Sequence, residues 1–480
     1  MRQVGSAFAW LTGGVFLALL LPGLARDGMF MDGQLYSAVA HNQANGYGTF
    51  WLPRFSEVGV AGMPTFHEHP PLFFGMQAVW FKVFGSAFWV ERAYNLVIAL
   101  GIAVLLGLLW RAWVPGEQGM RTVWLPLLLW IIVPTVFWSF HNNMIENTMA
   151  VFTTAAVLLV VRGADRWWPW YPAAVACVVL AVLCKGLPGA FPLAAPVLVA
   201  LTMRTVGLSR ALLHTLGMTV LAVGAFLALW AWPDARADLE PYVEKRLLHR
   251  IAAMPTVEYR WATLEMMFSN MLGPIALCGL AWGLGRRHQA SEAYPTRRPA
   301  LTMLLIGLSG VLPLMLTLVQ KSFYLTAALP LVSMALALWS LPFVEGLLAR
   351  ASAHPRVVEL VRWTGIVAVV GAIVASAVLF GSPARDAELL RDVHRIGAVV
   401  PAHSRVGVPA AMWNEWNLQT YLMRYHFISL DSSEEPLDWY ITRPDERPPV
   451  AASYRAMDLG LEELVLWRRV ALGEAHDLGT

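Results

Sequence analysis

A polar segment between residues 27 and 72 interrupts a very apolar chain and carries side chains that could do chemistry. Its acids include Asp32, Glu57 and Glu68, and its histidines include His67 and His69. A carboxylate such as Asp32 can take the proton from an attacking hydroxyl group. Glu68 with His67 or His69 could hold a divalent metal or orient an acceptor. Consecutive side chains point in different directions, so three ligand types in a row are a weak metal signal.

Further acids and cations lie near the ends of later apolar segments: His141, Glu146, Lys185, Arg246, Arg250 and Lys321. Arginine binds phosphate through a forked pair of hydrogen bonds, and lysine binds it as a point charge. Taken singly, these residues have structural explanations: Glu146 can cap a helix, and Lys185 can extend to the membrane surface. Charges are costly beside lipid, so the convergence of these residues at one face of the membrane would indicate a functional site. The combination of acids with several cations points to a lipid-linked phosphate as the leaving group.

The elements that position these residues are membrane helices. Of 480 residues, 57% are hydrophobic and 14% are charged, and the formal net charge is only +3, so a nucleic-acid partner is excluded. Apolar stretches close to the roughly 20 residues needed to cross a bilayer predict about eleven spans, at 4–25, 91–112, 122–140, 146–162, 168–184, 187–203, 211–232, 264–285, 300–319, 323–345 and 362–381.

The orientation of these spans depends on the segment 70–85, which is apolar but short and follows two prolines. Short cytoplasmic loops carry an excess of arginine and lysine. If this segment does not cross and the N-terminus is cytoplasmic, every arginine-rich short loop lies inside: Arg111, Arg121, Arg162, Arg166, Arg204, Arg210, Arg286, Arg287, Arg297, Arg298, Arg350, Arg356 and Arg362. We therefore expect residues 26–90 to form a first outer loop with juxtamembrane helices, and the C-terminus to lie outside.

The chain becomes polar after the last span, which predicts two domains, a transmembrane domain over 1–381 and a small soluble α/β domain over 382–480. In the second, short strands alternate with helices. The pattern predicts helices near 385–399 and 413–424, and strands near 404–408, 426–430, 438–442 and 463–467. Nothing in this domain has catalytic spacing. The fold class is thus an all-α polytopic membrane protein with a C-terminal α/β domain.

An ordered series of motifs resembles the GT-C superfamily of membrane glycosyltransferases. Within it, the chain is similar to the protein O-mannosyltransferase and aminoarabinose transferase branch, glycosyltransferase family 39. The resemblance covers residues 1–345, and its specificity lies in the order of the set. The motifs are Asp32-Gly33 with Tyr36 and Ala40, Glu68-His69-Pro70-Pro71-Leu72, Glu91-Arg92, Glu146-Asn147-Thr148, Cys184-Lys185-Gly186, and Lys321 with Tyr324 and Pro330.

The resemblance implies a GT-C fold and sugar transfer from a polyprenyl-phosphate carrier to an acceptor hydroxyl at the outer face, with inversion. By this resemblance, Asp32 and Glu146 take the positions of catalytic acids, Lys185 lies near the donor phosphate, and Arg246 or Arg250 matches an arginine of a later outer loop. From the residue types we also expect Glu68 among the catalytic acids and Lys321 and Tyr324 among the phosphate ligands. Tyr36, His67 and His69 are the expected positioning residues. Two departures stand out. Gly33 stands where many relatives have a second acid, which weakens the expectation of a metal. His69 stands where the aminoarabinose enzymes have a lysine, so the donor and the acceptor can differ from those of these enzymes.

We therefore expect a hexosyl- or pentosyltransferase that needs either no cofactor or a divalent metal held by Glu68, His67 and His69. Its expected partners are a lipid-linked sugar donor, membrane lipids and an acceptor glycan, lipid or protein. Its expected place is the bacterial inner membrane, with the site and the C-terminal domain outside. A transporter or flippase is the rival class, but it predicts charges on both sides of a midplane site, and often repeated halves. A non-catalytic scaffold is disfavoured only mildly.

Overall fold

The computed structural model describes residues 2–60, 63–163, 167–244, 255–288, 295–433 and 435–470. The chain forms two compact units. The helical unit comprises residues 1–25, 68–73 and 92–380, and the mixed unit comprises residues 26–67, 74–91 and 381–480. Most of the polar loop after the first helix therefore packs in the same unit as the C-terminal segment.

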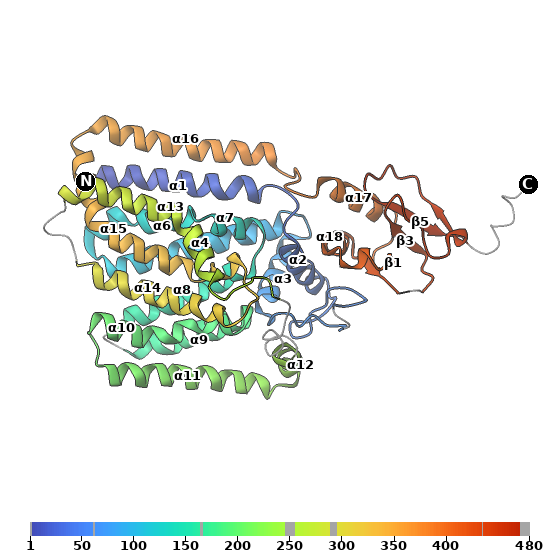
Figure 1. The fold of residues 1–480 in the computed structure, drawn as a ribbon, viewed down its shortest axis with the longest axis horizontal. Helices are drawn as coiled ribbons and strands as arrows, with labels where there is room; N and C mark the ends of the chain where they lie inside the picture. Colours follow the sequence, from blue (N-terminus) through green and yellow to red (C-terminus); the bar gives the residue numbers. More distant parts are fainter. Residues whose placement is uncertain are drawn as a thin grey trace, which may run out of the picture. The chain divides into compact units, whose positions relative to one another are not determined.

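The helical unit is a bundle of long apolar helices that run roughly alongside one another (Figure 1). Its elements are α1 (Arg2–Leu24), α4 (Val90–Trp113), α5 (Gly116–Thr122), α6 (Trp124–Ile131), α7 (Pro134–His141), α8 (Ile145–Gly163), α9 (Trp167–Lys185), η1 (Leu187–Ala194), α10 (Ala195–Met203), α11 (Leu208–Trp230), α12 (Pro233–Pro241), α13 (Ala262–Gly285), η4 (Arg286–His288), α14 (Arg297–Val311), η5 (Leu312–Leu316), η6 (Ser322–Leu325), α15 (Leu329–Ser352) and α16 (Pro355–Leu379).

Helices occupy all eleven apolar stretches that the sequence singles out, and the chain is a multi-pass membrane protein. Among the described residues, eight are long and apolar enough to cross a bilayer by themselves. These are α1, α4, α8, α11, α13, α14 with η5, α15 and α16. The described part of α9, and η1 with α10, are shorter apolar helices. Prolines at 188, 192 and 196 lie within η1 and at the start of α10, which accounts for the interrupted helix there.

The stretch 122–140, expected as one straight span, is a bent pair. Helices α5 and α6 cover Gly116–Ile131, and α7 follows at an angle of 74°. Pro134 is the first residue of α7, a position where its missing N–H costs nothing because that group has no partner within the helix. The bend therefore follows from the proline, which hydropathy alone does not register.

Helix α3 (Leu72–Phe84) is the short apolar segment on which the topology depends. Its 13 residues give a length of about 20 Å, against roughly 30 Å of hydrocarbon core. It is too short to cross by itself. Its length favours the topology in which this segment stays at the membrane surface.

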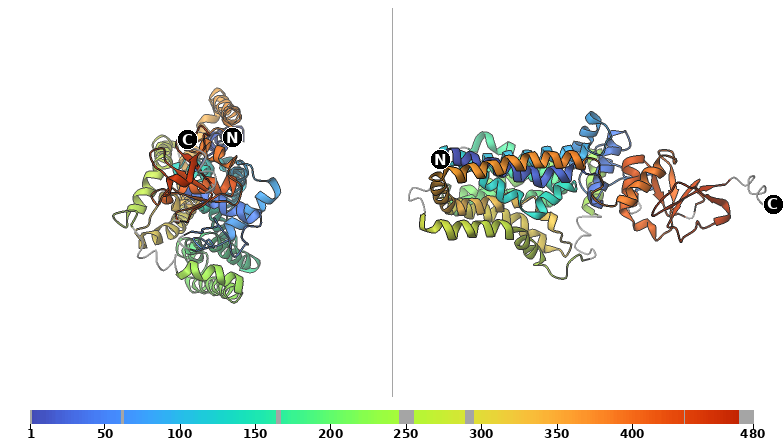
Figure 2. Two further views of the ribbon diagram at one scale, coloured as in Figure 1. Left: turned by 90° about the vertical axis from the view of Figure 1, so that its right-hand side faces the viewer. Right: turned by 90° about the horizontal axis from the view of Figure 1, so that it is seen from above.

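Close backbone contact joins α1 to α16, and the two helices lie side by side in both views (Figures 1 and 2). A Cβ atom added at Gly14 would lie 2.5 Å from the Gly365 carbonyl oxygen. A Cβ atom at Gly365 would meet the Trp10 backbone at 2.4 Å. Small residues at such crossings are typical of helix packing in membranes, where backbones approach closely.

The mixed unit joins loop helices to a small sheet. Its elements are α2 (Met31–Ala44), most of α3, α17 (Ala387–Gly397), β1 (Arg405–Gly407), η7 (Met412–Asn414), α18 (Trp416–His426), β2 (Ser429–Asp431), β3 (Trp439–Thr442), η8 (Ala451–Ser453), β4 (Tyr454–Ala456) and β5 (Val465–Arg469). The strand order is β2-β1-β3-β5-β4. β1 is parallel to β2 and β3, with Val406 opposite Leu430, whereas β5 pairs antiparallel with β3 and β4.

A large apolar core supports this sheet, and a smaller cluster of Tyr440, Tyr454 and Trp467 packs on β3, β4 and β5. Helices α17 and α18 contribute buried side chains such as Val393, Ile396 and Leu422, and the strands contribute Val406 and Ile441. The predicted α/β class of the C-terminal segment is confirmed. The predicted helices and strands match observed ones within a few residues, and β4 was missed.

Candidate active site

A buried ion pair in the helical unit joins the acid and the lysine that the sequence singles out. Glu146 lies in the first turn of α8 and is 0% exposed, while Lys185 is the last residue of α9 and is 4% exposed. The Lys185 ammonium group donates to Oε1 of Glu146. Burying two charges costs several kcal/mol each unless they are paired, so each residue requires the other in the absence of substrate.

An aromatic wall stands beside the lysine. The Nζ atom of Lys185 lies 4.5 Å from the centre of the Tyr324 ring and 5.7 Å from that of Phe323. Phe323 in turn stacks on Trp138, with ring centres 5.8 Å apart. A desolvated cation gains up to about 2 kcal/mol from an aromatic face. The structure thus brings Tyr324 to Lys185, residues that the sequence predicts as ligands of one phosphate.

The glycine after the lysine is required by the backbone. Gly186 has φ of +85°, a conformation that only glycine adopts readily. A Cβ atom there would lie 1.8 Å from the hydroxyl oxygen of Tyr242, which donates to the Lys185 carbonyl oxygen at 3.3 Å. The Lys-Gly motif therefore ends α9 sharply and lets Tyr242 pack over it. Sequence reasoning missed Tyr242, for which no motif gives a signal.

Polar contacts between neighbouring helices fix the start of α8, which carries Glu146. The hydroxyl groups of Tyr94 and Thr148 are 2.9 Å apart, and Ser139 donates to the Asn147 side chain at 2.8 Å. Both contacts are buried. Buried hydrogen bonds between neighbouring helices restrict their relative movement, because breaking one would leave a polar group unpaired in a low-dielectric interior. These hydrogen bonds hold the first turn of α8, and with it the carboxylate, in one place.

The candidate base belongs to the mixed unit. Asp32 is half-buried in the first turn of α2, and Tyr36, one turn later on the same face, is buried with its ring edge against Phe74 at 6.0 Å. His67 is buried and shares a hydrogen bond with Thr65. Of the three candidate acids, Asp32 therefore belongs to the mixed unit, and Glu146 and Glu68 belong to the helical unit.

Glu68 and His69 lie at the start of the Pro-Pro segment in the helical unit, where His69 is buried and Glu68 is half-buried. Among the residues that the structure describes, no group of three or more His, Cys, Asp or Glu side chains is arranged to hold a metal ion. The metal site that the sequence suggests at His67, Glu68 and His69 is thus not supported, because side chains of adjacent residues diverge.

Two further predictions for the phosphate ligands have different outcomes. Lys321 is exposed at the start of η6, three residues before Tyr324. Arg246 and Arg250 lie outside the described residues. The geometry therefore unites Glu146, Lys185 and Tyr324, and leaves the other phosphate ligands as predictions.

Comparisons with known proteins give structural neighbours only. No protein-family model matches the chain, and no curated protein matches it. Among solved structures, ArnT from Cupriavidus metallidurans bound to undecaprenyl phosphate is 15% identical with a TM-score of 0.69, covering 95% of this chain and 97% of that chain. The apo state of ArnT is 16% identical with a TM-score of 0.64, covering 95% and 96%.

A third neighbour is the apo oligosaccharyltransferase of Archaeoglobus fulgidus, which is 14% identical with a TM-score of 0.50 and covers 88% of this chain and 64% of that chain. At such low identities the likeness establishes the fold alone. The chain has the GT-C membrane fold that its motifs predict, including the C-terminal region.

Proposed function

We propose that this protein is a membrane glycosyltransferase that moves a sugar from a polyprenyl-phosphate carrier to an acceptor hydroxyl at the outer face of the membrane, inverting the anomeric carbon. The observation that carries the proposal is the buried Lys185, held by Glu146 and the Tyr324 ring at a helix end. A buried cation at the end of a membrane helix could bind the phosphate group of a lipid that enters from the bilayer. The GT-C fold, in a neighbour bound to undecaprenyl phosphate, supports this.

Two events must coincide in this reaction. The acceptor oxygen attacks the anomeric carbon and its proton passes to a carboxylate, for which Asp32 is the candidate. On the opposite side of the carbon, the bond to the phosphate oxygen breaks, and its electron pair stays on the polyprenyl phosphate. Attack from the face opposite to the leaving group inverts the carbon.

Lys185 would stabilise the charge that grows on the departing phosphate. Lysine is a compact point charge on a flexible stem, so its ammonium group can turn from Glu146 to a phosphate oxygen without any change of helix position. Such stabilisation accelerates the reaction only if it is stronger in the transition state than in the bound donor. Glu146 holds the lysine in place before the donor arrives. Arg246, Arg250 and Lys321 stay candidates for further phosphate contacts.

The remaining assignments follow from this reaction. Glu68 is a second candidate acid, and Tyr36, His67 and His69 are candidates for positioning donor and acceptor. No described residue is assigned to a metal. The active site and residues 382–480 would lie outside the cytoplasm, in a bacterial inner membrane, with a glycan, lipid or protein as acceptor. The donor would be a hexosyl or pentosyl polyprenyl phosphate.

The test of this proposal is the effect of Lys185→Met on binding of polyprenyl phosphate and on sugar transfer by the purified protein. Loss of one charge-assisted contact of about 1.5–3 kcal/mol should weaken binding by about 10- to 150-fold. Because this variant leaves a carboxylate buried, the double variant Glu146→Gln with Lys185→Met serves as a second, neutral form.

Lys82→Met is the matched control, because Lys82 is an exposed lysine at the end of another apolar helix. It should bind polyprenyl phosphate as the wild type does. Unchanged affinity in both Lys185 variants would show that the phosphate is held elsewhere, with Lys321 the next residue to replace. A wild type that transfers no sugar from any polyprenyl-phosphate donor would contradict the proposed function itself.

A further inference from the structure

One motif of the ordered set, Glu91, has a partner that the proposed reaction does not use. Glu91 lies in the first turn of α4 within the mixed unit and is 0% exposed. Its Oε2 atom accepts from Nη2 of Arg424 at 2.8 Å, and its Oε1 atom accepts from Nε at 3.2 Å. Arg424, from α18 near the C-terminus, is also 0% exposed. A fully buried forked pair between segments so distant in sequence needs a reason.

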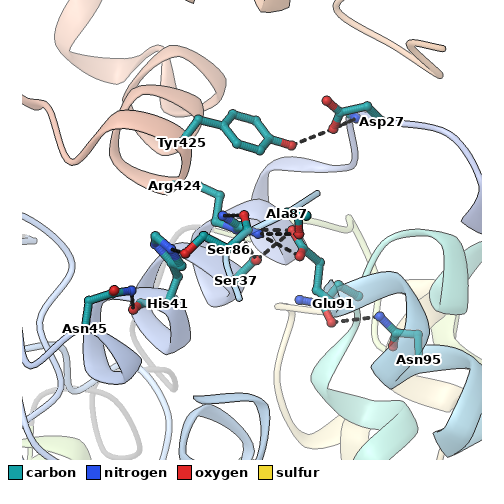
Figure 3. A network of polar contacts seen from close by, with 12 residues as sticks. Asp27, Ser37, His41, Asn45, Ser86, Ala87, Glu91, Asn95, Arg424 and Tyr425 are labelled. Carbon is teal, nitrogen blue, oxygen red and sulfur yellow. Dashed lines mark hydrogen bonds and ion pairs between the residues drawn. The ribbon is translucent and has the colours of Figure 1, made fainter. Parts of the chain in front are cut away.

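The guanidinium group of Arg424 is occupied on every edge (Figure 3). Besides Glu91, it donates from Nε to the Ser37 hydroxyl at 3.0 Å, from Nη1 to the Ser86 carbonyl at 3.1 Å and from Nη2 to the Ala87 carbonyl at 3.3 Å. Its Cζ atom lies over the rings of Phe81 and Tyr425, 4.6 and 5.3 Å from the ring centres. Only a planar fork can reach all of these acceptors at once, so lysine is not equivalent here.

The contacts of Arg424 belong to a continuous face of α18. Asn417, Tyr421, Arg424 and Tyr425 fall at positions i, i+4, i+7 and i+8, which share one side of a helix. Tyr421 donates to Asp386 at 3.0 Å and to the Met29 carbonyl at 3.3 Å.

Two more contacts of α18 reach the same loop. Tyr425 donates to Asp27 at 2.5 Å (Figure 3). Phe427, which follows the helix, stacks on His41 of α2 with ring centres 4.8 Å apart. Helix α18 and the residue that follows it thus contact both ends of the segment 27–41.

We propose that Arg424 is a positioning residue: through Ser37 and Glu91 it holds α2, and so Asp32, in the geometry that the transfer reaction needs. Ser37 lies on the same helix as Asp32. A base must be placed to within a fraction of an ångström, and a displacement of 1 Å can cost about 10²-fold in rate. This inference rests on the proposed function. It gives the C-terminal region a part in catalysis through Arg424, which acts by way of Ser37 and α2.

The experiment compares Arg424→Met and Arg424→Lys with Arg391→Met in the full-length protein. Arg391 forms an Arg–Glu pair with Glu462 in the same unit, but that pair is exposed, with side chains 47% and 35% accessible. Two quantities are measured: hydrogen exchange of the peptides covering α2, and sugar transfer resolved into kcat and binding of polyprenyl phosphate.

Arg424→Met should raise exchange in α2 by at least tenfold and lower kcat by about 10²-fold, with affinity for polyprenyl phosphate within about twofold of the wild type because Lys185 is untouched. Arg424→Lys should give values of exchange and of kcat between those of the wild type and of Arg424→Met. If the Met variant does not fold, the Lys variant provides the test. Arg391→Met should match the wild type in both quantities.

Wild-type exchange in α2, or wild-type kcat in a variant whose α2 exchanges faster, would overturn the positioning role. An equal loss of kcat and of donor affinity would overturn it as well, because it would indicate general disruption. If the wild type transfers no sugar, the proposed function fails, and exchange in α2 still decides whether Arg424 holds this helix.

Discussion

Each of the two units contains a buried ion pair, and the two pairs differ in kind. In the mixed unit, the guanidinium group of Arg424 donates hydrogen bonds to Glu91, to a hydroxyl group and to two backbone carbonyls. In the helical unit, Lys185 meets Glu146 and lies against an aromatic face. A saturated guanidinium fixes geometry, whereas an ammonium on a flexible stem can exchange one anion for another. The comparison teaches that burial alone does not identify a functional charge.

The two units would have different roles in the reaction. The mixed unit would hold the base Asp32 rigidly on α2, and the helical unit would supply a movable cation for the leaving phosphate. Removal of the base should then abolish sugar transfer without changing the affinity for polyprenyl phosphate. Removal of the cation should lower both the rate of transfer and this affinity.

Asp32→Asn should lower the rate of sugar transfer by about 10² to 10⁴-fold, because the amide keeps the size of the side chain but cannot accept the proton. Binding of polyprenyl phosphate should persist. Asp234→Asn is the control, since Asp234 is an exposed acid in the first turn of another short helix, α12. If Asp32 only capped α2, the variant would cost about 1 kcal/mol at most and the folded protein would turn over normally.

The docking of α18 on the loop should weaken in acid because of His41. Burial, reinforced by the neighbouring charge of Arg424, lowers the pKa of His41 to about 3 from 6.5. The folded state therefore keeps His41 neutral while the unfolded chain takes up a proton, so stability is present above pH 6.5 and is lost as the pH falls toward 3. At pH 5 the loss from this group should be about 2 kcal/mol.

Hydrogen exchange of α2 and α18 between pH 7 and pH 5, corrected for the intrinsic rate, measures this loss. In His41→Gln, which carries no titrating group and can still bond to Ser86, the dependence should be smaller by that amount. An unchanged pH dependence in the variant would assign it to other groups, of which His426 is the first, since burial and then the charge of His394 lower its pKa to about 4.

The smallest effect is expected at Tyr324. Removing the ring in Tyr324→Leu takes away a cation–π contact worth about 0.5–2 kcal/mol, so polyprenyl phosphate should bind about 2- to 30-fold more weakly. Tyr324→Phe keeps the ring and is the matched control for the hydroxyl group. Equal affinity in the Leu variant and the wild type would remove the aromatic wall from the site.

Hydropathy was sufficient to predict the membrane helices, because lipid requires long apolar helices. The alternation of short strands with helices predicted the α/β class of the C-terminal segment. The motif order pointed to Glu146 and Lys185 before their contact was known. The bend before α7 was missed because it depends on the position of Pro134 in a helix, which a count of apolar residues does not reveal.

Contacts between distant segments could not be predicted either. Arg424 and Glu91 are 333 positions apart, and Tyr242 meets Lys185 from 57 positions away. Neither partner has a local pattern that marks it, since only the fold brings the segments together. Strand β4 has three residues, too few for alternation to be recognised.

The role of Lys185 is tested most directly by an experimental structure of the protein with polyprenyl phosphate bound. We expect phosphate density within about 2.7–2.9 Å of the Lys185 ammonium nitrogen, with that nitrogen turned away from Glu146 and α2 unchanged around Ser37 and Arg424. Phosphate density at another place, with the contact between Lys185 and Glu146 intact, would contradict this role.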